Sequence, residues 1–154
     1  MTKTFYLTKE GLKKLKAEYE DLKKLQKTEH EEAPTLLEGD ALNPDYSFYK
    51  ENIDGLEQRL EELDNILKNY TIIKKPGKKE EGTVQIGAKV ILKNGSTEKE
   101  EFKIVGTLEA NPFEGKISNE SPIGIAFLGK QVGDTISINN NDNYKILKIQ
   151  YEES

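Results

Sequence analysis

The sequence predicts an α+β protein in which an antiparallel two-helix hairpin precedes a small, mostly antiparallel sheet with one short helix. Three observations support this prediction. Two segments carry apolar residues in alternating steps of three and four, which is the heptad pattern of paired helices. A charged, turn-prone stretch then separates these segments from the rest of the chain. After it, the pattern changes to short runs of β-branched and aromatic residues, which are typical of strands.

The first helix is expected to begin after Thr8, because threonine is a common N-cap residue. The row of core residues, here called the seam, then follows at heptad spacing with Leu12, Leu15, Tyr19 and Leu22. The same spacing reaches Leu36, so the helix is predicted to extend that far. Pro34 lies inside this range and should kink it, and Gly39 is expected to stop it.

The second helix is expected to begin at Asn43-Pro44-Asp45, which read as N-cap, first helical residue and first-turn acid. Its seam consists of Tyr49, Ile53, Leu56, Leu60, Leu63, Leu67 and Tyr70. If the chain folds back near Ala41, the seams face each other as Leu12–Tyr70, Leu15–Leu67, Tyr19–Leu63 and Leu22–Leu60, with Leu36 opposite Tyr46. This shared register predicts the hairpin.

The tip of the predicted hairpin is acidic. No lysine or arginine occurs between Lys27 and Lys50, and this interval contains Glu29, Glu31, Glu32, Glu38, Asp40 and Asp45. Like charges gathered at a bend repel one another unless a cationic group meets them. The pattern therefore indicates a function for the tip, although Asp40 also fits a turn and Asp45 a helix-opening acid. Phe48 is out of phase with the seam and is a candidate partner contact.

Residues 74–82 are rich in lysine, glutamate, proline and glycine and are interpreted as a linker. The predicted domains are thus 1–75 for the hairpin, 76–83 for the linker and 84–154 for the sheet domain. Strands are predicted over 88–92, 102–105, 135–138 and 144–149. Ser121-Pro122 is expected to cap a short helix that Gly129 ends.

The composition excludes several classes of site. The chain of 154 residues has no cysteine, which excludes disulfides, thiolate catalysis and cysteine-based zinc sites. His30 is the single histidine, so a histidine-cluster metal site is excluded as well. No apolar run approaches the ~18 residues of a membrane span, and no signal-peptide core is present, so we expect a cytoplasmic protein. The net charge of −5 argues against simple coating of duplex DNA.

Three segments resemble the Gre family of bacterial transcript-cleavage factors. The run Leu7-Thr8-Lys9-Glu10-Gly11-Leu12 resembles the family's first-helix start. Gly39-Asp40, followed by Asn43-Pro44-Asp45-Tyr46 and Lys50-Glu51, is similar to its acidic-tip motif. The run from Ser121 to Lys130, followed by Gly133-Asp134, resembles its C-terminal signature. Together these segments cover nearly the whole chain.

This resemblance implies that the second domain is FKBP-like and binds bacterial RNA polymerase, while the coiled coil enters the polymerase secondary channel. The implied partner-binding residues are Ser121, Pro122, Ile123, Gly124, Phe127, Leu128 and Gly129. The implied catalytic residues are Asp40, Asp45 and Glu38. Of these, Asp40 and Asp45 would be ligands of a Mg²⁺ ion shared with the polymerase active site, near the 3′ end of the nascent RNA. We expect the free protein to be a monomer that binds no cofactor, with no membrane partner.

The tip departs from the family pattern, which places a glutamate three residues after the aspartate. Here Asn43 occupies that position, so Asp40 matches the first acid, while Asp45 or Glu38 could replace the second. Two functions therefore stay open. One is an accessory factor, not itself an enzyme, that stimulates RNA cleavage by the polymerase. The other is a non-catalytic, anti-Gre-type regulator of the same channel. A third, a prolyl isomerase or chaperone, is disfavoured by the few aromatic residues in the strand region.

Overall fold

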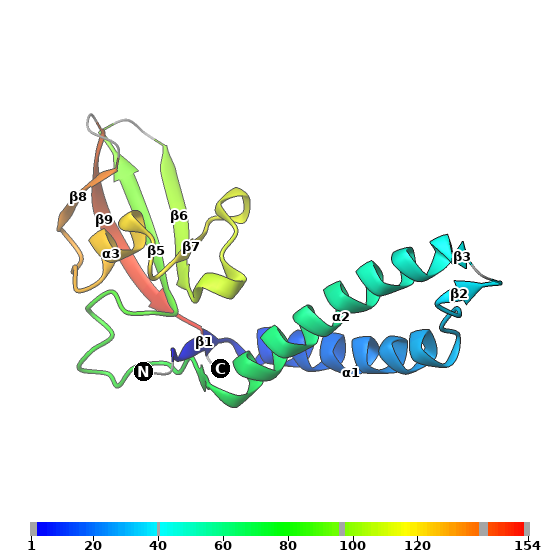
Figure 1. The fold of residues 1–154 in the computed structure, drawn as a ribbon. Coiled ribbons are helices and arrows are strands. Elements are labelled where there is room, and N and C mark those ends of the chain that lie inside the picture. Colours follow the sequence, from blue (N-terminus) through cyan, green and yellow to red (C-terminus); the bar gives the residue numbers. More distant parts are fainter. Residues whose placement is uncertain (1–2, 40, 96–97, 139–141, 153–154) are drawn as a thin grey trace. The chain divides into compact units, whose positions relative to one another are not determined.

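The computed structural model describes residues 3–39, 41–95, 98–138 and 142–152. The chain forms two compact units (Figure 1). One unit is Leu12–Asn69, and the other combines Lys3–Gly11 with Tyr70–Ser154. Residues 3–11, which the sequence-based ranges place with the hairpin, are thus grouped with the sheet. The α+β class is confirmed, with helices in the N-terminal part and a sheet in the C-terminal part.

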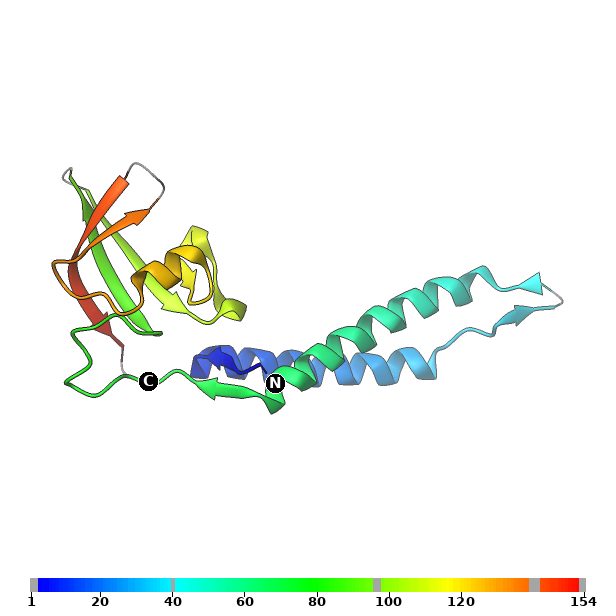
Figure 2. The same cartoon turned by 60° about the vertical axis from the view of Figure 1, so that its left-hand side comes forward.

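The helical unit is an antiparallel pair formed by α1 (Lys9–Glu31) and α2 (Pro44–Lys68), which lie side by side in both views (Figures 1 and 2). On α2, the predicted seam residues Ile53, Leu60 and Leu63 are buried. Ile66 is also buried, one residue before the predicted Leu67. The seam of α1 is half-buried throughout. The hairpin therefore buries the face that the heptad pattern predicts, while the individual leucine pairs stay a prediction.

The first helix is shorter than expected. It ends at Glu31, three residues before Pro34, so the prediction of a kinked helix that reaches Leu36 is wrong. Proline has no backbone N–H and its ring clashes with the carbonyl four residues earlier, while the residue before proline avoids the helical region. After the helix, β2 (Leu37–Glu38) and β3 (Ala41–Leu42) pair antiparallel. Gly39 lies between these strands with a φ of +66°, so it belongs to the tip turn and does not stop a helix.

The second helix is also shorter than predicted. It ends at Lys68 with Asn69 as C-cap, and Tyr70 lies in a strand, so the prediction that Tyr70 is the last residue of the helical seam is wrong. Strand β4 (Tyr70–Ile72) pairs in parallel with β1 (Phe5–Leu7), and Phe5 is opposite Tyr70. Both strands have three residues, which is too short for an alternating pattern to be recognised.

A five-stranded sheet with the order β7-β6-β5-β9-β8 forms the larger unit. Its strands are β5 (Ala88–Asn94), β6 (Lys99–Val105), β7 (Lys116–Ser118), β8 (Thr135–Ile138) and β9 (Asp142–Tyr151). Neighbouring strands are antiparallel except for β6 and β7, which run parallel. The four predicted strands are confirmed and the short β7 was missed.

One face of this sheet carries the core, which includes Val90, Leu92, Ile104, Ile146 and the fully buried Phe127. Phe127 comes from α3 (Pro122–Phe127), the short helix that the sequence predicts. Two single-turn helices, η1 (Thr107–Glu109) and η2 (Pro112–Glu114), lie between β6 and β7. No helix in the described ranges is long and apolar enough to cross a membrane.

Candidate functional site

The tip of the hairpin holds the three predicted catalytic carboxylates, and the structure describes them unequally. Asp40 lies outside the described residues. Glu38 belongs to β2, where its backbone is opposite Ala41. Asp45 is exposed in the first turn of α2, as expected for an acid that favours a helix N-terminus. Within the described part of the chain, no three aspartate, glutamate or histidine side chains gather as a metal site. A Mg²⁺ ion shared at the tip therefore stays a prediction.

Asn43 connects the tip to α2 and confirms the predicted N-cap. Its Oδ1 accepts a hydrogen bond from the backbone N–H of Asp45 at 3.0 Å. Its Nδ2 donates to the carbonyl of Thr35 at 3.0 Å, and its backbone N–H donates to the carbonyl of Leu36 at 2.9 Å. Both ends of the side-chain amide are therefore used to close the tip. In this structure the residue three after Asp40 has a structural role.

Besides its acidic residues, the tip exposes several large apolar side chains. Leu36, Leu37, Leu42 and Phe48 are 53%, 52%, 73% and 68% exposed. Leu37 and Leu42 are opposite each other across β2 and β3. Leu36 and Leu42 also line a hollow of about 340 Å³ together with Tyr46, the residue predicted to lie opposite Leu36. Phe48 is accessible, as expected for a residue out of phase with the seam. The exposed leucines were missed because the predicted helix placed Leu36 in its core.

Side-chain hydrogen bonds join the helices at two places in the described residues between the tip and the base, and Nε2 of His30 also lies 3.7 Å from Oε1 of Glu57. Arg59 of α2 donates from Nε and Nη2 to the two carboxylate oxygens of Glu18 on α1, at 2.8 and 3.0 Å. These hydrogen bonds hold the pKa of Glu18 below its usual range, against a smaller opposing effect of burial. Closer to the tip, the Tyr49 hydroxyl lies 3.0 Å from Nδ1 of His30. Both contacts run in the antiparallel sense that the seams predict.

The predicted partner-binding segment is only partly accessible. Ser121 caps α3 by accepting from the Gly124 N–H at 3.0 Å. Gly124 is buried, and a Cβ there would lie 1.9 Å from the carbonyl oxygen of Ser118, so glycine is required for packing. Phe127 is 0% exposed and fills the core. Gly124 and Phe127 thus pack inside the fold of the free protein, and the predicted partner roles of this segment stay a prediction.

The accessible residues of this region lie on α3 and on the turns that follow it. Pro122 and Gly129 are exposed, Leu128 is 36% exposed and Ile123 is half-buried. Ile125 and Val132 are 61% and 56% exposed and were not among the predicted residues. They could have been found from the alternation within Ile123-Gly124-Ile125-Ala126-Phe127, since a short helix with Phe127 inward turns Ile125 outward.

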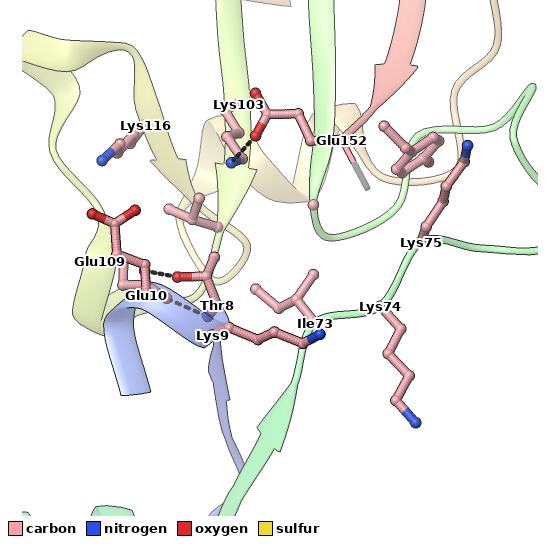
Figure 3. Close-up of a pocket in the computed structure, with 13 residues that line it drawn as sticks. Thr8, Lys9, Glu10, Ile73, Lys74, Lys75, Lys103, Glu109, Lys116 and Glu152 are labelled. Atoms are coloured by element: carbon pink, nitrogen blue, oxygen red, sulfur yellow. Dashed lines mark hydrogen bonds and ion pairs between the residues drawn. The ribbon is translucent and has the colours of Figure 1, made fainter. Parts of the chain in front are cut away.

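The base of α1 is held in the sheet unit by a carboxylate from η1. Thr8 caps α1, as predicted, through a 3.0 Å hydrogen bond from the Gly11 N–H. The Thr8 N–H and hydroxyl in turn donate to the two oxygens of Glu109, at 2.8 and 2.5 Å (Figure 3). Gly11 is buried beside this carboxylate. A negative charge at a helix N-terminus is favourable, so Glu109 both orients and stabilises the first turn of α1.

Known proteins resemble this chain over almost its whole length. Residues 5–72 match the family described as transcription elongation factor, N-terminal, and residues 79–151 match the one described as transcription elongation factor, GreA/GreB, C-term. The transcription elongation factor GreA of Clostridium acetobutylicum is 41% identical over 155 residues, covering 96% of this chain and 98% of that protein. GreA of Macrococcus caseolyticus is 40% identical over 157 residues, covering 97% and 98%.

A solved structure, the GreA factor homolog 1 (Gfh1) of Thermus thermophilus, is 23% identical with a TM-score of 0.42, covering 96% of this chain and 99% of that one. The two family matches leave only the chain ends and the segment between residues 72 and 79 uncovered. The protein therefore belongs to the GreA/GreB family of transcription elongation factors.

Proposed function

We propose that this transcription elongation factor binds bacterial RNA polymerase through the sheet unit and places its helical hairpin in the secondary channel. There the tip carboxylates stimulate cleavage of backtracked RNA by the polymerase. The main observation behind this proposal is the charge of the tip. This member of the family has no lysine or arginine between Lys27 and Lys50, so the charged side chains of the tip are acidic apart from His30. Docking is assigned to the accessible apolar residues of α3 and of the segment that follows it, namely Ile125, Leu128 and Val132.

The tip carboxylates are proposed to act in a site that the polymerase completes. Asp40, with Asp45 or Glu38, supplies one or two oxygen ligands, and the remaining ligands belong to the polymerase, close to the RNA 3′ end. When bound in such a site, Mg²⁺ would supply charge neutralisation at the phosphodiester and a more acidic water. The free protein is proposed to bind Mg²⁺ weakly, because so few carboxylates replace little of the ion's water shell.

Asn43 favours a second candidate, a non-catalytic regulator that occupies the same channel. The family pattern has a glutamate at this position, whereas the Asn43 side chain caps α2 and bonds Thr35. An amide carries no charge and is already engaged here, so it cannot replace the missing carboxylate. If Asp45 only stabilises the N-terminus of α2, Asp40 is the one carboxylate left of the two that the family pattern expects at the tip.

A transcript-cleavage assay on a backtracked complex with the polymerase of the same organism separates these candidates. The wild-type protein should accelerate cleavage, and Asp40→Asn should abolish the acceleration while competing normally for polymerase. Glu20→Gln, an exposed carboxylate in the middle of α1, is the control for lost charge and should cleave like the wild type. A wild-type protein that competes for polymerase without accelerating cleavage would establish the regulator instead.

A further inference from the structure

We propose that the outer face of the five-stranded sheet binds a small phosphorylated molecule of the di- or triphosphate class. The site is a row of three lysines, Lys89, Lys103 and Lys116, one from each of β5, β6 and β7. Nothing in the proposed function uses this face, and the proposal stands on the sheet register, the ion pairs and the hollows that adjoin the row.

The sheet register places the three lysines next to one another. Lys89 is opposite Lys103 across β5 and β6, and Lys103 is opposite Lys116 across β6 and β7. Residues opposite each other in a sheet point to the same face, and neighbouring strands are about 4.8 Å apart. The next residue on each strand, Val90, Ile104 and Ile117, is buried in the core. The lysine row therefore lies on the face opposite the core.

A row of like charges on adjacent strands is unfavourable, since like charges directly opposite each other destabilise a sheet. Each lysine is offset by a carboxylate, with Lys89–Glu101 at 2.8 Å, Lys103–Glu152 at 3.3 Å and Lys116–Glu114 at 3.4 Å. All three carboxylates are at least half exposed. Such exposed pairs contribute little to stability, so a multivalent anion can displace them.

Two hollows beside the row give a ligand space. The first, of about 250 Å³, is lined by Lys103 and Lys116 together with Ile73, Val105 and Tyr151. The second, of about 300 Å³, is lined by Lys89 and shares Tyr151 with the first. Lys9 extends toward Ile73 on the far side of the first hollow from Lys103 (Figure 3). Ammonium groups thus surround a floor with apolar and aromatic surface.

This combination selects the class of ligand. Lysine ammonium groups act as point charges toward phosphate oxygens, and three of them in a row match a chain of linked phosphates better than a single anion. The Glu109 carboxylate that also lines the first hollow is already engaged by Thr8, so it competes little for these ammonium groups. The Tyr151 ring and the aliphatic floor offer a surface for an attached nucleoside.

Isothermal titration of the full-length protein with inorganic triphosphate, and separately with ATP, tests the proposal. The variant Lys103→Gln/Lys116→Gln should weaken triphosphate binding at least tenfold. The control Lys13→Gln/Lys24→Gln removes the same charge from exposed positions of α1 and should change binding less than twofold. Tighter binding of ATP than of triphosphate would show that the nucleoside contacts the floor, whereas equal binding assigns the site to the phosphates alone.

Backbone amide NMR on the wild-type protein keeps the test independent of any folding defect in the variants. Triphosphate should shift the amide signals of β5, β6 and β7 and leave those of α2 unchanged. Equal weakening in both double variants, shifts spread along α1, or no binding at millimolar triphosphate would overturn the proposal. Because no polymerase is present, these outcomes are separate from success or failure of the cleavage assay.

Discussion

Replacing Gly11 by alanine tests how Glu109 stabilises the first turn of α1, which belongs to the sheet unit. A Cβ at Gly11 would lie 2.5 Å from Oε1 and 2.6 Å from Cδ of Glu109, far inside contact distance. A free glutamate end would move away at little cost. Here the carboxylate is tied to Thr8 by hydrogen bonds of 2.8 and 2.5 Å, so its movement breaks one or both of them.

Two opposing contributions set the size of the effect. Helix propensity favours alanine over glycine by about 1 kcal/mol. Each hydrogen bond to a charged group contributes roughly 1.5 kcal/mol at the lower end of its range, which suits the half-buried Thr8 and Glu109. Loss of one bond gives a net destabilisation of roughly 0.5 kcal/mol and loss of both roughly 2 kcal/mol. The larger value corresponds to a fall in melting temperature of about 4–8 °C.

Urea denaturation followed by circular dichroism at 222 nm measures this change. Gly55→Ala is the matched control, because Gly55 is exposed within α2 and no atom lies within 4 Å of its added Cβ. The control should be stabilised by about 0.5–1 kcal/mol. In a Glu109→Ala background, Gly11→Ala should also become stabilising. If Gly11→Ala stabilises the otherwise wild-type protein as Gly55→Ala does, the Glu109 contact does not hold α1 and the reasoning fails.

Two further predictions concern the helical hairpin. Arg59→Gln should cost roughly 0.5–1 kcal/mol at pH 7, as expected for a partly exposed pair with two hydrogen bonds. Because the pKa of Glu18 is lowered in the folded state, this stabilisation is present above the unfolded value of about 4.3 and is lost as the pH falls through the folded pKa. Urea unfolding should therefore show that Arg59→Gln and wild type differ at pH 7 and converge once the pH falls below the folded pKa of Glu18, and a constant difference down to acid pH would contradict this. Leu63→Ala should cost about 2–5 kcal/mol because Leu63 is fully buried, whereas Leu25→Ala, at a residue 46% exposed, should change stability by less than about 0.5 kcal/mol. If the two leucine substitutions change stability equally, burial of the seam does not explain the stability of the hairpin.

The sequence predicts well what local chemistry decides. Hydrogen-bonding capacity predicts the helix caps at Thr8, Asn43 and Ser121. Heptad spacing predicts the buried seam residues Leu60 and Leu63. Each depends on residues within one or two helical turns of one another. For that reason a single sequence is enough to find them.

The sequence predicts poorly what distant residues decide. Glu109 reaches Thr8 across 101 residues, and no local pattern marks it as the carboxylate beside Gly11. Strands β1 and β4 have three residues each and pair across the whole hairpin. At the tip, heptad spacing favoured continuing the helix to Leu36, but the backbone restriction at Pro34 outweighs one weak seam position.

The segments that precede and follow the helical hairpin both belong to the sheet unit, so an isolated C-terminal fragment is a poor probe of docking. The family matches divide the chain between residues 72 and 79, yet residues 3–11 are grouped with the sheet. Leu7 of β1 is 0% exposed, and a Cβ on Gly106 would lie 2.0 Å from the carbonyl oxygen of Tyr6. The start of the chain thus packs directly on the backbone that follows β6.

A fragment cut after β4 would lose this cover and the Thr8–Glu109 bonds together. Loss of polymerase binding by such a fragment would then reflect damaged packing as easily as a missing contact. Single substitutions at exposed residues of α3, made in the full chain, avoid this ambiguity because they leave the N-terminal cover in place.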